Sequence, residues 1–475
     1  MKKATNNDMI HLHCHTDGSN LRLKDSNIKV NELIDYAYDL GNNGVAITDH
    51  ECLSEHITGI NYLNDLKEKG KINKDFKLIL GNEIYLVSKN KLKQKLEDKE
   101  KIKFYHCLLL AKDKIGHKQL RDLSSRAWRD NYLIYRGMTR VPTYYSDMEE
   151  VIGENKGHII MLTACLGSYL GEKSIVLSQT EDEEEIYNIK MDMSEYIEWG
   201  LDLFGEDFYL EMQPNKSEEQ VFYNKLLVDI SKGYDIPLVV TTDVHYLDES
   251  TRQMHKAFLT SDDEDSNREV DYFYDTTHFF KVEDIYANMD YLDTDIVTKA
   301  IMNTKMIANK IDIYDWFATP KIPLIPLPPK DEWFPIDMDL VKKYPNIYKV
   351  YKDKYEHHTY LIHQIFKGIE EHKIPKEELN DTLLRVDLEC SEIIGTSEVL
   401  KEPVGGYLTT MQKNTDLIWE VSCIGAGRGS GVGWIINYLL GITQINPIKQ
   451  EGMKLQHWRF LNSERVTFPD LCFVF

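Results

Sequence analysis

The sequence predicts a mixed α/β fold built around a βα barrel. Short apolar segments alternate with helix-like segments through the first 250 residues, which is the order found in βα barrels. Nearly every apolar segment also has a His, Asp, Glu or Cys at or beside its end, where such barrels place their chemistry. The seven predicted strands are Met9–His15, Gly44–His50, Lys77–Glu83, Phe104–Lys112, His158–Cys165, Phe208–Gln213 and Pro237–Tyr246.

Two of the intervening helices can be placed from their own signals. Apolar residues recur at helical spacing from Val30 to Leu40 and stop at Gly41, which predicts a helix between the first two strands. Before the last strand, Ser217 and Gln220 form a capping box that predicts the start of a helix. We expect this helix to run to about Ser231, with Gly233 beyond its end.

A break in the pattern follows the barrel. Six of the 14 prolines lie between Pro320 and Pro335, and successive prolines exclude helix and favour an extended connector. After them, Asn346–His372 and Glu377–Ile394 have helical patterns, and a glycine-dense stretch begins at Gly425. We therefore predict a barrel over residues 1–250, a helical and proline-rich connector over 251–335, and a further segment over 336–475.

Composition limits the location and the partners. The net charge of −22 argues against a nonspecific DNA coat, although metal ions or a local basic groove can reverse the field at one site. No apolar run approaches the ~20 residues that cross a bilayer, and no secretory signal is evident. Seven scattered cysteines without a CxxC pair indicate a reducing compartment. We expect a cytoplasmic protein with no membrane partner.

The side chains at the strand ends form a metal-ligand pattern. His13 and His15 lie two apart on one strand, so they share a face with side chains ~7 Å apart. Asp243 and His245 repeat this spacing on the last strand, and His106 departs from the pattern because it lies near the start of its strand. The donors are His13, His15, His50, Glu83, His106, Cys165, Asp243 and His245.

This donor set predicts a site with more than one ion. A single strand-end histidine is usually structural, whereas eight donors from six strands exceed the needs of one tetrahedral ion. Mixed imidazole, carboxylate and thiolate donors favour Zn²⁺, Mn²⁺ or Fe²⁺ over Mg²⁺ or Ca²⁺. We expect two or three divalent ions that activate water and bind a phosphoryl group. Asp49 could ligate an ion, or it could orient a metal-binding side chain without contacting the metal itself.

The same residues resemble a known family. The segments HLHCHTDGS, AITDH, GNEIYLV, YHCLLLAK, TACLG and TTDVHY are similar to the motifs of the polymerase and histidinol phosphatase (PHP) domain. They most resemble the version that opens the alpha subunit of bacterial replicative DNA polymerase III, a C-family DNA polymerase. The segments GRGSGVGWIINYLLGIT, INPI and RFLNSERVTFPD resemble the start of its polymerase palm, so the likeness spans the whole chain in order.

The resemblance adds expectations about the barrel. It implies a distorted (β/α)7 PHP barrel, followed by an incomplete α+β polymerase palm segment. It also implies a ninth metal ligand from the loop after the first strand, where this chain offers Asp25. The implied site holds three ions and has phosphoesterase or 3′→5′ exonuclease activity on DNA ends.

In the palm, the resemblance implies a loop for the incoming nucleotide at Gly427, Arg428, Gly429 and Ser430. Main-chain N–H groups and an arginine can bind phosphates there. The family's catalytic motif supplies three aspartates for Mg²⁺, but only Asp470 remains here, because Cys472 and Val474 occupy the other positions. A thiol is a poor ligand for Mg²⁺, so we expect no polymerisation unless another chain completes the palm.

The leading functional expectation is a DNA polymerase III alpha-like protein of DNA replication in truncated or split form. We expect its barrel to hydrolyse phosphodiesters, and the family it resembles consists of nucleotidyltransferases. The expected partners are DNA (a primer 3′ end or a single strand) and a second polypeptide that carries the rest of the polymerase. One alternative is a freestanding PHP phosphatase or nuclease. The other is a non-catalytic decoy that binds the replisome.

Overall fold

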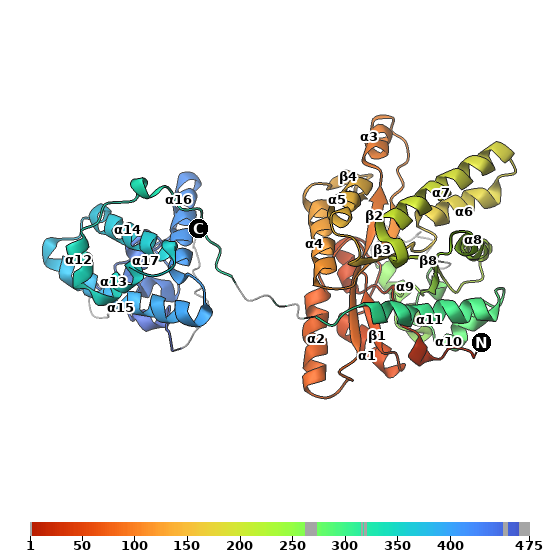
Figure 1. Ribbon diagram of the computed structural model, residues 1–475, viewed down its shortest axis with the longest axis horizontal. Helices are drawn as coiled ribbons and strands as arrows, with labels where there is room; N and C mark the ends of the chain where they lie inside the picture. The colour runs from red at the N-terminus through yellow and green to blue at the C-terminus, as the bar shows by residue number, and fades with distance from the viewer. Residues whose placement is uncertain (1, 262–272, 315–316, 318–320, 450–454, 465–475) are drawn as a thin grey trace. The chain divides into compact units, whose positions relative to one another are not determined.

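The protein is described here from a computed structural model that covers residues 2–261, 273–314, 317, 321–449 and 455–464 (Figure 1). The chain divides into two compact units, Met1–Trp316 and Phe317–Phe475. None of the helices among the described residues combines the length and apolar character that a membrane crossing requires.

The first unit is built on one curled, mixed sheet. Its strands follow the order β1-β2-β3-β7-β8-β9, and the short β6 pairs with β2. Most neighbours are parallel, but β3 runs antiparallel to both β2 and β7. The strands are β1 (Gly44–Ile47), β2 (Lys77–Val87), β3 (Tyr105–Ala111), β6 (Thr143–Tyr144), β7 (Ile159–Leu162), β8 (Phe208–Met212) and β9 (Leu238–Val240).

The predicted first strand is an extended segment that joins the two edges of this sheet. His11 forms a parallel bridge with Val45 beside β1, and Cys14 forms one with Val244 after β9. The mixed α/β barrel expected from the sequence is therefore confirmed. One strand departs from the parallel order of a simple βα barrel, because β3 runs antiparallel to β2 and β7.

Helices surround the sheet of the first unit (Figure 1). The helix predicted at Val30–Leu40 is confirmed as α1, and the helix after Ser217 is confirmed as α8. The latter runs to Tyr234, past the predicted end near Ser231, so Gly233 lies inside the helix and Asp235, with a φ of 54°, is its left-handed cap. The helices are α1 (Val30–Asp39), α2 (His56–Glu68), α3 (Lys89–Glu97), α4 (Lys114–Arg129), α5 (Tyr145–Gly153), α6 (Tyr169–Gln179), α7 (Glu183–Phe204), α8 (Glu218–Tyr234), α9 (Arg252–Leu259), α10 (Val282–Asn288) and α11 (Thr294–Lys310).

A hairpin of β4 (Leu133–Tyr135) and β5 (Met138–Arg140) forms a separate two-stranded sheet in the first unit. Helices α9 to α11 also belong to this unit. They lie within the stretch predicted as a connector, and the division at residues 250 and 335 stays a prediction.

The second unit is helical in its described part. The proline-rich residues 321–329 have no regular structure, as expected for an extended connector. The described residues of this unit contain no strand, so the strands of an α+β segment are not found among them. Its helices are α12 (Met338–Lys343), α13 (Pro345–Tyr351), α14 (Glu356–Glu371), α15 (Lys376–Leu400), α16 (Val404–Val421) and α17 (Ile435–Leu439).

Two features fix the packing of α17 in this unit. Trp434, just before it, is fully buried and donates a hydrogen bond from Nε1 to the carbonyl of His457 at 2.7 Å. A Cβ atom at Gly368 of α14 would lie 2.0 Å from the carbonyl oxygen of Leu439. Glycine is therefore required where α14 and α17 meet.

Candidate metal centre

The strands bring the predicted donors to one end of the sheet. His13 and His15 lie on the segment between β1 and β9, and Asp25 lies in the loop that follows this segment. The remaining donors lie on or just after the strands. His106 lies at the start of β3, and this departure from the pattern has a physical cause. Because β3 is antiparallel to its neighbours, its beginning lies beside their carboxyl ends.

Glu83 lies at the middle of the cluster. One carboxylate oxygen, Oε2, is 2.7 Å from Nδ1 of His50 and 3.3 Å from Nε2 of His15. The other oxygen, Oε1, is 2.5 Å from Nδ1 of His106. Cys165 joins this side, with Sγ 3.4 Å from Nδ1 of His106. A carboxylate that contacts three imidazoles is placed to bridge cations.

Two aspartates connect the remaining histidines. Oδ1 of Asp243 is 3.1 Å from Nε2 of both His13 and His15. Oδ2 of Asp25 is 2.8 Å from Nε2 of His50 and 3.1 Å from Nε2 of His245. The structure thus brings together all nine residues expected to ligate metal.

The donor atoms form three overlapping groups in which all atoms lie within 4.8 Å of one another. His15 belongs to two of these groups and Glu83 to two. Shared donors between neighbouring groups are what a cluster of two or three ions requires. The groups are His15, His50 and His245; His13, His15 and Glu83; and Glu83, His106 and Cys165.

Unsatisfied buried atoms show that these residues fit metal ions. Nε2 of His13 and both carboxylate oxygens of Glu83 are buried, and their short contacts to neighbouring donor atoms lack the geometry of hydrogen bonds among the described residues. A buried polar atom without a partner costs ~1–3 kcal/mol, and more when charged. Cations between these donors would remove that cost.

Metal binding to this cluster is coupled to protonation. Burial opposes protonation of His13, His50 and His245, but neighbouring carboxylates outweigh it and raise the pKa of all three rings, so a metal would displace protons from them. Burial, together with the nearby His50 and His245, lowers the pKa of His15 to about 3, so its imidazole is neutral. Burial opposes ionisation of Glu83 and Asp243, but neighbouring histidines outweigh it and hold the pKa of both carboxyls below the usual range. Neutral imidazoles and ionised carboxylates are the forms that bind metals.

Asp49 lies behind the cluster rather than in it. Its carboxylate accepts hydrogen bonds from the backbone N–H of Thr16 at 2.6 Å and from the hydroxyl of Ser19 at 2.8 Å. Ser19 in turn lies 3.2 Å from Nδ1 of His15. Asp49 therefore holds the loop that positions His15.

Two further residues contact the donors and were missed in the sequence. Glu211, in β8, is fully buried, and its Oε1 lies 2.7 Å from Nδ1 of His13. A carboxylate on one ring nitrogen of a ligating histidine fixes the ring with its other nitrogen toward the metal. The hydroxyl of Tyr274 donates to Asp25. An acid inside an otherwise apolar strand was the available signal for Glu211.

A cavity of about 320 Å³ opens onto the cluster. Asp25, His50 and Asp243 line it together with Arg140 from the β4–β5 hairpin. Nε of Arg140 is buried and has no hydrogen-bond partner among the described residues. The cavity therefore offers a guanidinium group opposite the metal donors, which suits an anionic substrate.

The predicted nucleotide loop lies in the second unit and differs in kind. Gly427 and Gly429 have φ values of 135° and 72°, which favour glycine. Arg428, Gly429 and Ser430 are exposed, so the loop's main chain is open to a ligand. Asp470 lies outside the described residues.

Comparison with known proteins gives two family matches in order along the chain. Residues 11–215 match the PHP domain, and residues 359–473 match the family described as the bacterial DNA polymerase III alpha NTPase domain. The first match contains the metal cluster up to Cys165 and Glu211, and the second contains the Gly427–Ser430 loop.

Curated relatives match nearly the whole chain. A DNA-directed DNA polymerase of Bacillus phage SPbeta is 40% identical over 480 residues, which cover 98% of this chain and 36% of the relative. The DNA polymerase III subunit alpha of Aquifex aeolicus is 28% identical over 491 residues, with 98% and 36% covered. The chain thus spans about a third of the length of these relatives. Its residues thus match the PHP domain and then the DNA polymerase III alpha domain, and nearly the whole chain is similar to part of a phage DNA polymerase and of a DNA polymerase III alpha subunit.

Proposed function

We propose that the first unit is a metal-dependent phosphoesterase that removes nucleotides from the 3′ end of DNA, as part of an alpha-subunit-like protein of DNA replication. The observation that supports this proposal is a set of nine donors in contact with one another, five of which (Asp25, His50, His106, Asp243 and His245) line one cavity. His13, His15, Asp25, His50, Glu83, His106, Cys165, Asp243 and His245 would hold two or three ions of Zn²⁺, Mn²⁺ or Fe²⁺.

Bound ions of this kind lower the pKa of water and stabilise charge on a phosphoryl group. The chain's own residues have separate tasks. Glu211 and Asp49 orient His13 and the His15 loop. Arg140 would bind a nonbridging oxygen of the scissile phosphate, because its guanidinium lines the same cavity. Burial of the cluster excludes bulk water from the reacting centre.

Two parts of the family activity need more than this unit. We propose that Gly427–Ser430 binds the triphosphate of a nucleotide. Nucleotidyl transfer with Mg²⁺ would also need aspartates at the positions that Cys472 and Val474 occupy, and we propose that a second polypeptide supplies them. The thiol of Cys165 as a donor favours a reducing, cytoplasmic location.

Hydrolysis by the purified full chain tests the proposal. The protein is stripped of metal, reloaded with Mn²⁺, Zn²⁺ or Fe²⁺, and given 5′-labelled single-stranded DNA, a primer with a mismatched 3′ end and a small phosphate monoester. We expect metal-dependent shortening of both DNAs, with two or three ions per chain by elemental analysis. Cleavage of the monoester alone would indicate that the first unit is a phosphatase and not an exonuclease.

A further inference from the structure

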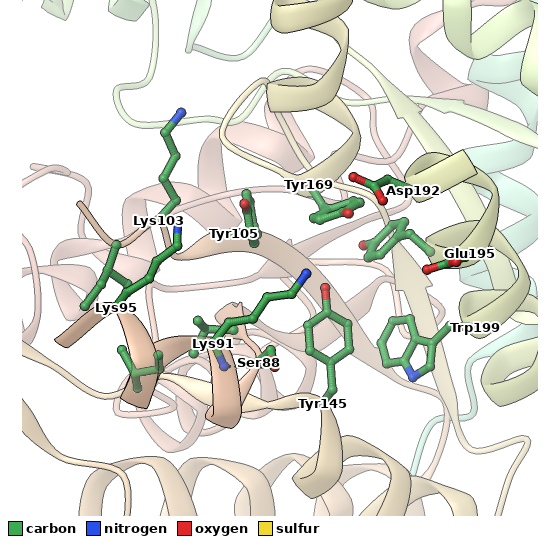
Figure 2. Close-up of a pocket in the computed structure, with 14 residues that line it drawn as sticks. Ser88, Lys91, Lys95, Lys103, Tyr105, Tyr145, Tyr169, Asp192, Glu195 and Trp199 are labelled. Atoms are coloured by element: carbon green, nitrogen blue, oxygen red, sulfur yellow. Dashed lines mark hydrogen bonds between the residues drawn. The ribbon is translucent and has the colours of Figure 1, made fainter. Parts of the chain in front are cut away.

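A second cavity of the first unit, about 310 Å³ in volume, has an aromatic wall (Figure 2). We call it the aromatic pocket and define it by Tyr105, Tyr145, Tyr169, Tyr196 and Trp199. These side chains come from β3, α5, α6 and α7. None of them belongs to the metal cluster.

The rings of the aromatic pocket are packed against one another. Tyr169 stacks on Tyr196 with centroids 4.9 Å apart, and Tyr105 meets Tyr169 edge-on at 5.0 Å. Tyr145 meets Trp199 edge-on at 4.9 Å. All except Tyr196 are half-buried, so ring surface remains open to the cavity. Such a surface can take a flat ring by stacking.

Lysines line one side of this pocket in an otherwise acidic chain. Residues 89–103 contain seven lysines and three acids, whereas the whole chain has a net charge of −22. Lys91, Lys95 and Lys103 line the pocket. Lys91 is exposed and forms no ion pair with the described residues, while Lys103 pairs with Glu172 at 2.5 Å.

The acids at the pocket cancel only part of this charge. Asp192 lines the cavity, but it is paired with Lys173. Glu195 is exposed at the opposite rim from Lys91 (Figure 2). A wall of aromatic rings with ammonium groups on one side matches a ligand that has both a flat base and an anionic backbone.

The aromatic pocket adjoins the metal centre. Ile102 lines both cavities. Tyr105 and His106 are neighbours on β3, and successive strand residues face opposite sides, so one lines each cavity. A chain-like ligand could therefore occupy both cavities by passing over residues 102–104.

We propose that the aromatic pocket binds a nucleobase of single-stranded nucleic acid, while Lys91 and Lys95 bind adjacent phosphates. The strand's direction, with its 3′ end in the metal centre, rests on the proposed function. Binding itself requires no hydrolysis. The acidic remainder of the chain repels the strand and so confines it to this basic segment.

Fluorescence anisotropy with the full chain tests the base and phosphate contacts separately. The probe is fluorescein-labelled (dT)12 in EDTA, which prevents hydrolysis, and an abasic strand of equal length is the second probe. We expect (dT)12 to bind about tenfold more tightly than the abasic strand, because stacking favours the base. Tyr145→Ala should remove this preference, and Tyr145→Phe should keep it.

Two matched controls separate the pocket from general charge and exposed rings. Lys91→Glu should weaken binding of (dT)12 about tenfold, whereas Lys93→Glu, which makes the same change on an exposed residue of α3 outside the pocket, should have a much smaller effect. Tyr187→Ala on α7, also outside the pocket, should leave the base preference intact.

The outcomes distinguish this proposal from the proposed function. Equal binding of both strands, or equal effects of Lys91→Glu and Lys93→Glu, would refute nucleic-acid binding by the aromatic pocket even if metal-dependent hydrolysis persists. The opposite outcome is base-dependent binding that Tyr145→Ala removes, together with no hydrolysis by the metal-loaded wild type. It would refute the proposed phosphoesterase activity and support the pocket. Thermal unfolding of each variant identifies any loss of fold, and Lys91→Glu alters only an exposed side chain.

Discussion

The metal centre of the first unit and the Gly427–Ser430 loop of the second are two opposite ways to prepare an anion site. The first gathers buried acids and imidazoles whose charges need cations to be satisfied. The second presents exposed backbone and one exposed arginine. A buried charged site depends on its ligand for stability, whereas an exposed loop gains little stability from its ligand.

The largest expected effect comes from removing two donors. His13→Ala together with His15→Ala should reduce hydrolysis to background and reduce bound metal, because both rings contact Asp243 within the cluster. Elemental analysis and the DNA assay measure this. His11→Ala is the matched control, since His11 is buried on the same segment but contacts Thr242 and Phe279 instead. Hydrolysis that persists in the double variant would show that the metal cluster is not the active site.

A buried carboxyl in the second unit gives the next effect. Burial raises the pKa of Glu389 to about 7, from its usual value near 4.5. Between these values the folded state holds a proton that the unfolded state has released. Its contribution to stability is therefore complete below pH 4.5 and falls by about 3 kcal/mol as pH rises through 7.

Glu389→Gln should flatten this pH dependence, because glutamine does not ionise. Urea denaturation of the full chain at pH 5 and pH 8, followed by circular dichroism, measures the slope for each protein. An equal slope in wild type and variant would show that Glu389 keeps its charge, which the N–H groups of Ile435 and Ile436 then stabilise.

A smaller effect is expected where α14 meets α17. Gly368→Ala should destabilise the chain by ~1–3 kcal/mol, because its Cβ would lie 2.0 Å from the carbonyl oxygen of Leu439. Gly233→Ala is the matched control in helix α8, where no atom lies within 4 Å of the added Cβ. It should be neutral or stabilising by up to ~1 kcal/mol. Equal melting temperatures for both variants would contradict the close packing.

The smallest effect belongs to the loop. Arg428→Ala should change stability by less than ~0.5 kcal/mol, because the side chain is exposed. Arg385→Ala is the comparison in the same unit, since its guanidinium donates to Glu389 and to the carbonyls of Gly433 and Leu455. That change should destabilise by ~1 kcal/mol or more. A large loss in Arg428→Ala would mean that the loop is structural.

The sequence predicts most of the barrel because eight of the nine donors follow or lie within a recognisable apolar strand, whereas Asp25 lies in a loop and was indicated only by the family resemblance. The direction of β3 could not be predicted, since the connection from β2 contains a helix, α3, like the connections between parallel strands. Glu211 was missed because it lies within a strand rather than at its end.

The remaining gaps have other causes. Tyr274 reaches Asp25 from about 250 positions away, and no local pattern encodes such a contact. The predicted helix over Asn346–His372 is interrupted, with α13 ending at Tyr351 and α14 beginning at Glu356. The aromatic pocket brings together rings from four elements, so the periodicity of any one segment could not predict it.

The alternation of Tyr105 and His106 makes β3 intolerant of changes in length. Adding or deleting one residue just before Tyr105 would turn each side chain to the other face of the sheet. A tyrosine would then replace an imidazole among the metal donors, and an imidazole would enter the aromatic wall. A change of length between β2 and β3 would have to fall among the residues around α3 to leave the pairing of β3 with β2 and β7 unchanged.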